Sequence, residues 1–280
     1  MINVSIRLVG EVMPTDFHYV QFMNILLRTC MDELSLAQLG RNYYDPTAAS
    51  LLREYNLELW PGYITTIKQQ ESDMMLCCEL STKVLRTDTC YDQFKVAAKG
   101  DLKRNITRIL LGNIVITRYN NKTYKIDDID FNDNPGKTFN VSCLSILHNM
   151  SLLKSLYYLQ WKGTETTIAE YYKKRYNIVI KDLKQPLLVS NPNARQRRAG
   201  ITEPIKLVPE LCHMTGLSDE QRADFKLMKA VNGVTLGDPK NRVLQLNKFS
   251  QRVTSNENIK KELLEWDMVS VLTLFLFDER

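Results

Sequence analysis

The sequence is poor in the residue arrangements that hold metals. Only three histidines occur in 280 residues, and they lie far apart at His18, His148 and His213. The six cysteines contain no C-x-x-C pair, which is the spacing typical of a structural zinc site. We therefore expect neither a metal nor another cofactor, and we expect free thiols in a reducing, cytoplasmic compartment, with the nucleus as the alternative.

Long apolar runs and catalytic signatures are missing as well. The longest apolar run, Met268 to Phe277, has about half the length that a bilayer span needs. No charged segment followed by an apolar one opens the chain as it would in a signal peptide. The spacings G-x-S-x-G, H-E-x-x-H and G-x-x-x-x-G-K-[ST] do not occur either. The sequence therefore gives no motif-based indication of an enzyme and no indication of a membrane protein.

The composition is that of a globular protein with a mild basic excess. Hydrophobic residues make up 44% and charged residues 25% of a chain long enough for two domains. Lysine and arginine number 37 against 32 aspartates and glutamates, so the net charge is +5. This excess permits nucleic-acid binding without requiring it, because a mixed surface can also be basic by chance.

The first part of the chain is predicted to form a small α+β unit. Apolar residues from Phe17 to Leu36 recur at three and four residue intervals, which predicts an amphipathic helix. Strands are expected at 57–60, 63–68 and 74–80, with Pro61-Gly62 separating the first two.

The middle of the chain is predicted to form a small, partly open barrel around one helix. Residues 113–117 and 123–129 read as a hairpin that turns at Asn120-Asn121. Thr167 and Glu170 fit a capping box for the helix. Further short strands are expected at 178–180, 186–190 and 205–208, an exposed basic loop at 195–200, and helices at 219–231 and 258–266.

An acidic cluster between Asp127 and Asp133 is the most obvious candidate for metal or acid-base chemistry. It fails the calcium-loop pattern, because a loop that starts at Asp128 would have Asp133 in place of the required glycine and Phe139 in place of the required glutamate. On a strand, Asp127 points away from Asp128 and Asp130. We interpret the cluster as a solvated strand end, and a nuclease that uses it as a weaker alternative.

The segment Ala169–Tyr176 interleaves tyrosines with lysines and arginine. Single-stranded RNA is held by bases that stack on aromatic rings and by cations that meet phosphates. A tyrosine also offers a hydroxyl group to a phosphate oxygen. The alternative is an ordinary amphipathic helix whose tyrosines are half-buried, and the segment alone leaves both interpretations open.

Several blocks of the sequence, taken together, resemble the Piwi subfamily of Argonaute proteins. The blocks that are similar to the PAZ domain of that family are 122–130, 170–177, 182–190 and 208–212. The blocks 40–46, 59–62 and 81–86 resemble its N-terminal domain and first linker. The similarity covers nearly the whole chain.

The resemblance implies an α+β fold and a domain order. We expect a partial N-terminal domain with linker 1 at 1–87, a PAZ domain at 88–216, and linker 2 at 217–280, with no MID or Piwi domain following. The PAZ domain would be an OB-like, partly open β-barrel with an inserted αβ module. Because slicing carboxylates belong to the Piwi domain of the family, no cleavage is expected of this chain.

The resemblance also implies that the chain binds the 3′ end of a small single-stranded RNA of the piRNA type, within Piwi-mediated silencing and alongside Piwi-pathway proteins. Lys206 departs from the aromatic or methionine that many relatives have beside the ribose, which bears on the preference for a 2′-O-methyl group. Carried over by motif, the 3′-end site comprises the aromatics Tyr124, Phe139, Tyr171 and Tyr176, with Leu207 over the terminal sugar and Lys122 and Lys206 for phosphate. Secondary RNA contacts are expected from Tyr172, Arg195, Arg197 and Arg198.

Two segments do not resemble the family. They are an insert at 140–161 and the apolar tail at 270–280. We interpret both as translated intron or a gene-model error, against a genuine insertion. A truncated, non-catalytic interaction fragment is therefore the alternative to the RNA-binding hypothesis.

Overall fold

The computed structural model describes residues 16–70, 73–97, 101–140, 165–198, 202–235 and 238–265, with a few single positions elsewhere. The insert expected at 140–161 and the tail at 270–280 thus lie, except for Asn140, outside the described residues. The chain divides into two compact units, and the long strands β4 (Leu57–Gln70) and β5 (Asp73–Thr89) contribute to both. No helix in the described ranges is both long and apolar enough to cross a bilayer.

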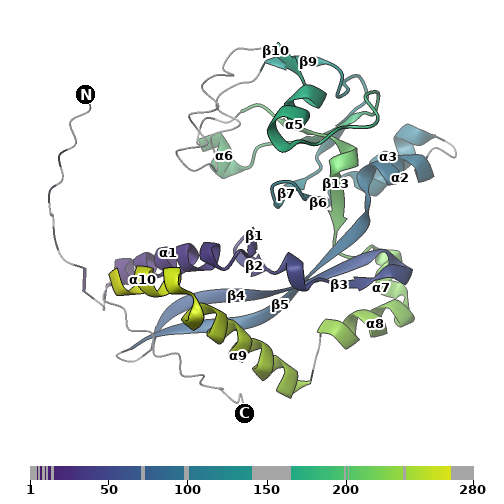
Figure 1. The fold of residues 1–280 in the computed structure, drawn as a ribbon. Helices are drawn as coiled ribbons and strands as arrows, with labels where there is room; N and C mark the ends of the chain where they lie inside the picture. Colours follow the sequence, from purple (N-terminus) through teal and green to yellow (C-terminus); the bar gives the residue numbers. More distant parts are fainter. Residues whose placement is uncertain are drawn as a thin grey trace. The chain divides into compact units, whose positions relative to one another are not determined.

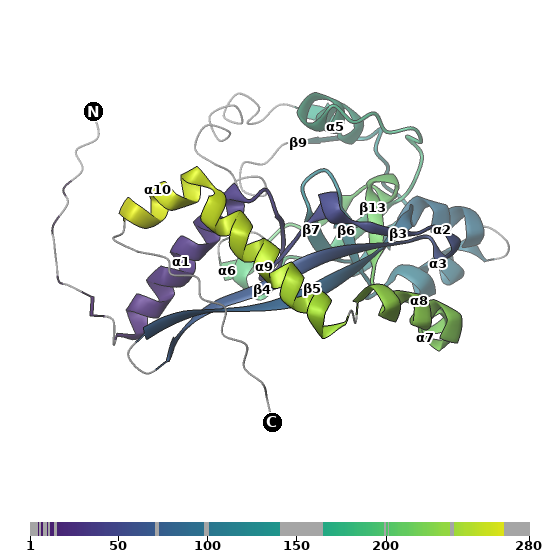
Figure 2. The ribbon, with the colours of Figure 1, turned by 60° about the horizontal axis from the view of Figure 1, so that its bottom comes forward.

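Unit 1 comprises residues 1–50, 60–83 and 222–280. The expected amphipathic helix is confirmed as α1 (Phe17–Glu33), which is followed by the antiparallel strands β1 (Ala37–Leu39) and β2 (Asn42–Tyr44). β2 pairs with β4, and the unit also contains the helices α8 (Phe225–Thr235), α9 (Pro239–Ser255) and α10 (Glu257–Glu265) (Figure 2). Their shared core contains Met31 of α1, Phe249 of α9 and Ile259 of α10, so segments more than 200 residues apart in the sequence stabilise each other.

Pro61 and Gly62 do not end a strand, contrary to the expectation from the sequence. β4 runs unbroken through both, and the carbonyl of Pro61 accepts a hydrogen bond of 2.8 Å from the backbone N–H of Asp45. Gly62 lies opposite Tyr44 in β2, where any side chain would overlap Tyr43 and Tyr44. The glycine therefore serves close strand packing rather than a turn.

Unit 2 comprises residues 51–59 and 84–221 and contains the expected partly open barrel (Figure 1). Within it, β13 (Cys212–Thr215) pairs with the end of β5 and with β6 (Ile114–Thr117), which pairs with β7 (Lys122–Lys125). A second sheet has the order β12 (Ile205–Leu207), β11 (Leu187–Ser190), β8 (Asp128–Asp130). The helices α2 (Cys90–Ala97) and α3 (Leu102–Leu110) pack on the core of this barrel.

The inserted αβ module of unit 2 consists of β9 (Thr138–Asn140), β10 (Glu165–Thr167) and α5 (Ile168–Tyr176). β9 and β10 are antiparallel, and β10 leads directly into α5 (Figure 1). The expected α+β class and the barrel with an inserted module are therefore confirmed.

Several local expectations from the sequence were wrong. The expected strand 123–129 is divided between β7 and β8, which belong to different sheets. Residues 178–180 form no strand, and the basic segment contains the short helix α6 (Ala194–Arg198). The helix expected at 219–231 is split into α7 (Asp219–Ala223) and α8 (Phe225–Thr235), because the Asp224 carboxylate accepts the backbone N–H of Lys226 and restarts the helix. The helix expected at 258–266 is confirmed as α10.

Candidate functional site

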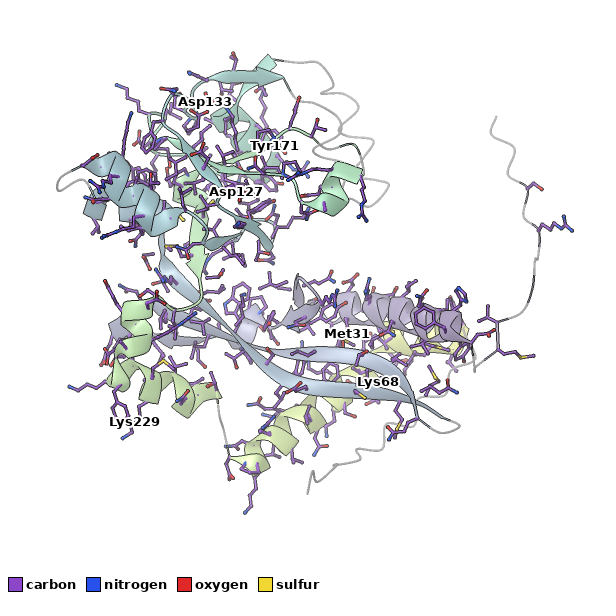
Figure 3. All side chains as sticks on the ribbon, turned by 180° about the vertical axis from the view of Figure 1, so that it is seen from behind. Met31, Lys68, Asp127, Asp133, Tyr171 and Lys229 are labelled. Atoms are coloured by element: carbon purple, nitrogen blue, oxygen red, sulfur yellow. The ribbon has the colours of Figure 1, made fainter. Side chains whose placement is uncertain are left out.

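A cluster of tyrosines occupies the contact between α5 and the turn that joins β6 to β7. The ring centroids of Tyr119 and Tyr176 are 4.5 Å apart, and those of Tyr119 and Tyr172 are 5.3 Å apart. The ring centroid of Tyr171, which is labelled in Figure 3, lies 5.6 Å from that of Tyr172 and 6.4 Å from that of Tyr176, and both pairs are edge-to-face. We call these four residues, together with Tyr124 of β7, the tyrosine cluster.

The local sequence fixes α5 at both ends. The hydroxyl of Thr167 accepts the backbone N–H of Glu170 at 3.1 Å, which confirms the expected N-cap. The Glu170 carboxylate accepts instead from the hydroxyl of Thr166, at 3.1 Å. At the other end Asn177 adopts the left-handed conformation, with φ of 54°, that commonly ends helices. The two ends leave Tyr171, Tyr172 and Tyr176 on the side of α5 that faces Tyr119.

Asn120 organises the turn beside the cluster. Its side-chain oxygen accepts the backbone N–H of Lys122 at 3.1 Å and the hydroxyl of Thr117. Its amide donates to the hydroxyl of Tyr124 at 3.4 Å. Asn121 completes the turn with φ of 51°, which asparagine tolerates better than most residues. The expected turn at Asn120-Asn121 is thus confirmed, and it also orients Tyr124.

Burial raises the pKa of four phenols of the tyrosine cluster. It is the largest cause of the raised pKa of Tyr119, Tyr124, Tyr171 and Tyr172. The neighbouring phenol groups raise the pKa of Tyr171 and Tyr172 further. At neutral pH these residues therefore present aromatic faces and hydroxyl donors rather than phenolates.

Two cations border the tyrosine cluster. The guanidinium carbon of Arg175 lies 5.0 Å from the ring centroid of Tyr176. Lys122 is partly buried, and its pKa is lowered first by burial and then by the positive charge of Arg175. No ion pair links Lys122 to any carboxylate in the described part of the chain. The arrangement therefore offers positive charge next to clustered aromatic rings.

The structure does not place every expected site residue in this cluster. Leu207 is buried in the barrel core with Ile129 and Leu188, on the opposite face of β12 from Lys206. The Lys206 ammonium pairs with Asp130 at 3.2 Å and with Asp133 at 2.5 Å. Its charge is thus held by two carboxylates of its own chain.

The remaining expected site residues lie outside the tyrosine cluster or are described only by the position of their backbone. Phe139 pairs with Thr166 in the β9–β10 ladder, and Arg195 belongs to α6; their side chains lie outside the description. Arg197 is exposed and donates from Nε to the carbonyl of Pro192 at 2.8 Å. Arg198 is exposed on the same helix.

The acidic cluster is engaged in local structure. Asp127 accepts the backbone N–H of Asn191 at 2.8 Å and pairs with Lys125. Asp130 accepts the backbone N–H of Asn132, and Asp133 that of Asn134. Across the described ranges, no three histidine, cysteine or acidic residues converge as a metal site would require.

Sequence reasoning missed Tyr119, Arg175 and Asn120 as members of the site. Tyr119 stands alone in a turn, and no periodicity relates it to α5, which is about 50 residues later in the sequence. Arg175 was part of the recognised basic and aromatic segment. Arg175 is next to Tyr176 in the sequence and three or four residues from Tyr172 and Tyr171. Residues at this spacing are neighbours on the surface of a helix, and this spacing is the signal that could have identified Arg175.

A partly open barrel with an αβ module that carries aromatic residues defines the PAZ class of domains, and the comparisons agree. A PAZ domain family model matches residues 87–236, which is more than half of the chain. The chain is 40% identical over 269 residues to the Piwi-like protein Siwi of Bombyx mori, and 37% identical over 269 residues to the protein aubergine of Drosophila melanogaster. The chain therefore belongs to the PAZ-domain family, in its Piwi branch.

The structure supports the same assignment. The crystal structure of Drosophila Piwi aligns with a TM-score of 0.64 and 34% sequence identity over 93% of this chain. The matches cover 95% of this chain in both Siwi and aubergine, but only 28% and 29% of those proteins, and 30% of the Piwi structure. The chain thus spans less than a third of the length of the relatives it matches.

Proposed function

We propose that this chain binds the 3′ end of a single-stranded small RNA at the tyrosine cluster, as a non-cleaving part of Piwi-type silencing. The terminal bases stack on the rings of α5 and β7, and Lys122 and Arg175 meet the terminal phosphates. Membership of the PAZ-domain family supports the ligand class.

The position of Lys122 carries the proposal. A partly buried ammonium group that has a second cation nearby and no carboxylate partner among the described residues is unfavourable by itself. An anionic ligand would relieve that cost. The rings of Tyr124 and Tyr176 favour a nucleotide as that anion, because a nucleotide combines a phosphate with a base that can stack on a ring.

The neutral phenols support the same ligand. A phenol is protonated at neutral pH, and burial raises the pKa of Tyr124 and Tyr171 further, so their hydroxyl groups are hydrogen-bond donors that suit a phosphate oxygen. A 2′-O-methyl group on the terminal ribose would add apolar contact with the tyrosine rings. We propose this modified end as the preferred ligand.

Affinity measurements on Lys122→Met test the proposal. We expect it to weaken binding of a short single-stranded RNA about tenfold, and to reduce the slope of log affinity against log salt by roughly 0.7, as the loss of one phosphate contact should. Lys103→Met is the matched control, because Lys103 lies on α3 with its ammonium 5.2 Å from the ring centroid of Phe131, away from the cluster. Equal losses in both variants would contradict a phosphate site at Lys122.

A further inference from the structure

We propose that Lys206 is a positioning residue, which ties the inserted module to the barrel and so sets the place of the tyrosines on α5. This inference rests on the proposed function for its effect on RNA, but its structural part is testable without RNA. It assigns to Lys206 a role through its own chain rather than a phosphate contact.

Lys206 joins two parts of unit 2 that are far apart in the sequence. It lies on β12, a strand of the barrel, and its ammonium reaches Asp130 at the end of β8 and Asp133 three residues later. The hydrogen bond to Asp133 is the largest cause of the raised pKa of Lys206. Although burial acts to raise the pKa of Asp133, the hydrogen bond and charge of Lys206 hold it below its usual value.

The loop held by Lys206 leads directly to α5. Residues 131–137, which we call the root loop, connect β8 to β9. In this loop Asp133 accepts the backbone N–H of Asn134, and the carbonyl of Pro135 accepts the backbone N–H of Ala169 at 3.0 Å. Ala169 is the second residue of α5, and Tyr171 follows two residues later. A short series of bonds therefore runs from Lys206 to the first turn of the helix that carries the cluster.

Lys137 provides a matched comparison, because it faces the same carboxylate from within the root loop. Its ammonium lies 3.6 Å from Asp133, and it also donates to the carbonyl of Asn132. Removing Lys137 or Lys206 changes the net charge equally, at the same carboxylate. Of these two lysines, however, Lys206 is the one that lies on a strand of the barrel, so its ion pair with Asp133 adds to the packing of Phe131 on the barrel core.

Positioning and direct phosphate contact predict opposite effects of Asp133→Asn. If Lys206 met phosphate itself, neutralising Asp133 would release its ammonium and strengthen RNA binding. In the positioning role the same change loosens the root loop and weakens binding.

The affinity of the full chain for a short single-stranded RNA distinguishes the two. We expect Asp133→Asn and Lys206→Met each to weaken RNA binding about threefold to tenfold. This range corresponds to the loss of about one or two partly exposed ion pairs. The double variant should lose little more than either single one. Lys206→Arg should retain most of the affinity, and Lys137→Met should lose less than about twofold. Stronger binding by Asp133→Asn, or equal losses in Lys137→Met and Lys206→Met, would overturn the proposal.

Hydrogen exchange without RNA tests the structural part alone. Amide protons of α5 should exchange faster in Lys206→Met than in the wild type or in Lys137→Met, whereas those of α2 should not change. Unchanged exchange in α5 would overturn the positioning role. If α5 loosens as expected but the wild-type chain binds no RNA, the positioning role stands and the proposed function fails.

Discussion

The hydroxyl oxygens of Tyr119 and Tyr172 lie 3.0 Å apart and share a hydrogen bond. Tyr119 belongs to the β6–β7 turn and Tyr172 to α5, so this bond connects the barrel to the inserted module inside a buried aromatic contact. Tyr172 is only 6% exposed, so that water has little access to its hydroxyl. The stability of the module should therefore depend on this pair.

Removing one hydroxyl of that pair should destabilise unit 2. We expect Tyr119→Phe to lower the free energy of unfolding by about 1 to 2 kcal/mol, because the buried hydroxyl of Tyr172 loses its partner. The double variant Tyr119→Phe with Tyr172→Phe should recover part of the loss, since no buried polar group is then unpaired. Urea unfolding of Tyr119→Phe, Tyr172→Phe and the double variant measures both effects. A double variant that loses more stability than the sum of the two single variants would contradict this account.

Gly62 should resist substitution because of strand packing in unit 1. Gly62→Ala places a methyl group against the Tyr43 carbonyl and the Tyr44 ring, and should cost about 1 to 3 kcal/mol of stability. Gly233→Ala is the control, because a Cβ at this position of α8 meets no atom within 4 Å. It should be stabilising by about 0.5 to 1 kcal/mol. Thermal unfolding of both variants checks the opposite signs.

His213 should make the fold sensitive to mild acid. Burial, followed by the charge of Arg118, lowers its pKa in the folded chain, and its Nδ1 has no hydrogen-bond partner among the described residues. As the pH falls, His213 is therefore protonated at a higher pH in the unfolded chain than in the folded chain. The contribution of neutral His213 to the free energy of unfolding is fully present above pH about 6.5 and is lost as the pH decreases below that value. The melting temperature should drop more between pH 7.5 and 5.5 in the wild type than in His213→Gln.

His18→Gln provides the control for this measurement, because His18 is exposed on α1. Its melting temperature should follow that of the wild type across the same pH range. A wild type and a His213→Gln variant that lose stability in parallel would contradict the assignment of the effect to His213.

Local sequence signals predicted the parts of the fold that local interactions decide. The cap of α5 by Thr167 was predicted correctly, because it depends on residues only three positions apart in the sequence. The unbroken path of β4 through Gly62 was not predictable, because a proline-glycine pair normally ends a strand and only the approach of β2 explains it.

The tyrosines of α5 could be predicted from the sequence, but their contacts with residues of the barrel could not. The spacing of Tyr171, Tyr172 and Tyr176 within one helix is visible in the sequence. The contact of these residues with Tyr119 depends on a fold that no local pattern encodes. The same holds for Lys206, whose partner Asp133 lies 73 residues earlier in the sequence.

The most direct test of the central claim compares linear and circular forms of one short RNA. Both forms have the same bases and nearly the same charge, but only the linear form has a 3′ end. The account predicts that the chain binds the linear RNA at least about tenfold more tightly at moderate salt, and that Tyr171→Ala with Tyr176→Ala removes this preference. Equal affinity of the wild-type chain for the linear and circular forms would contradict binding of the RNA 3′ end at the tyrosine cluster.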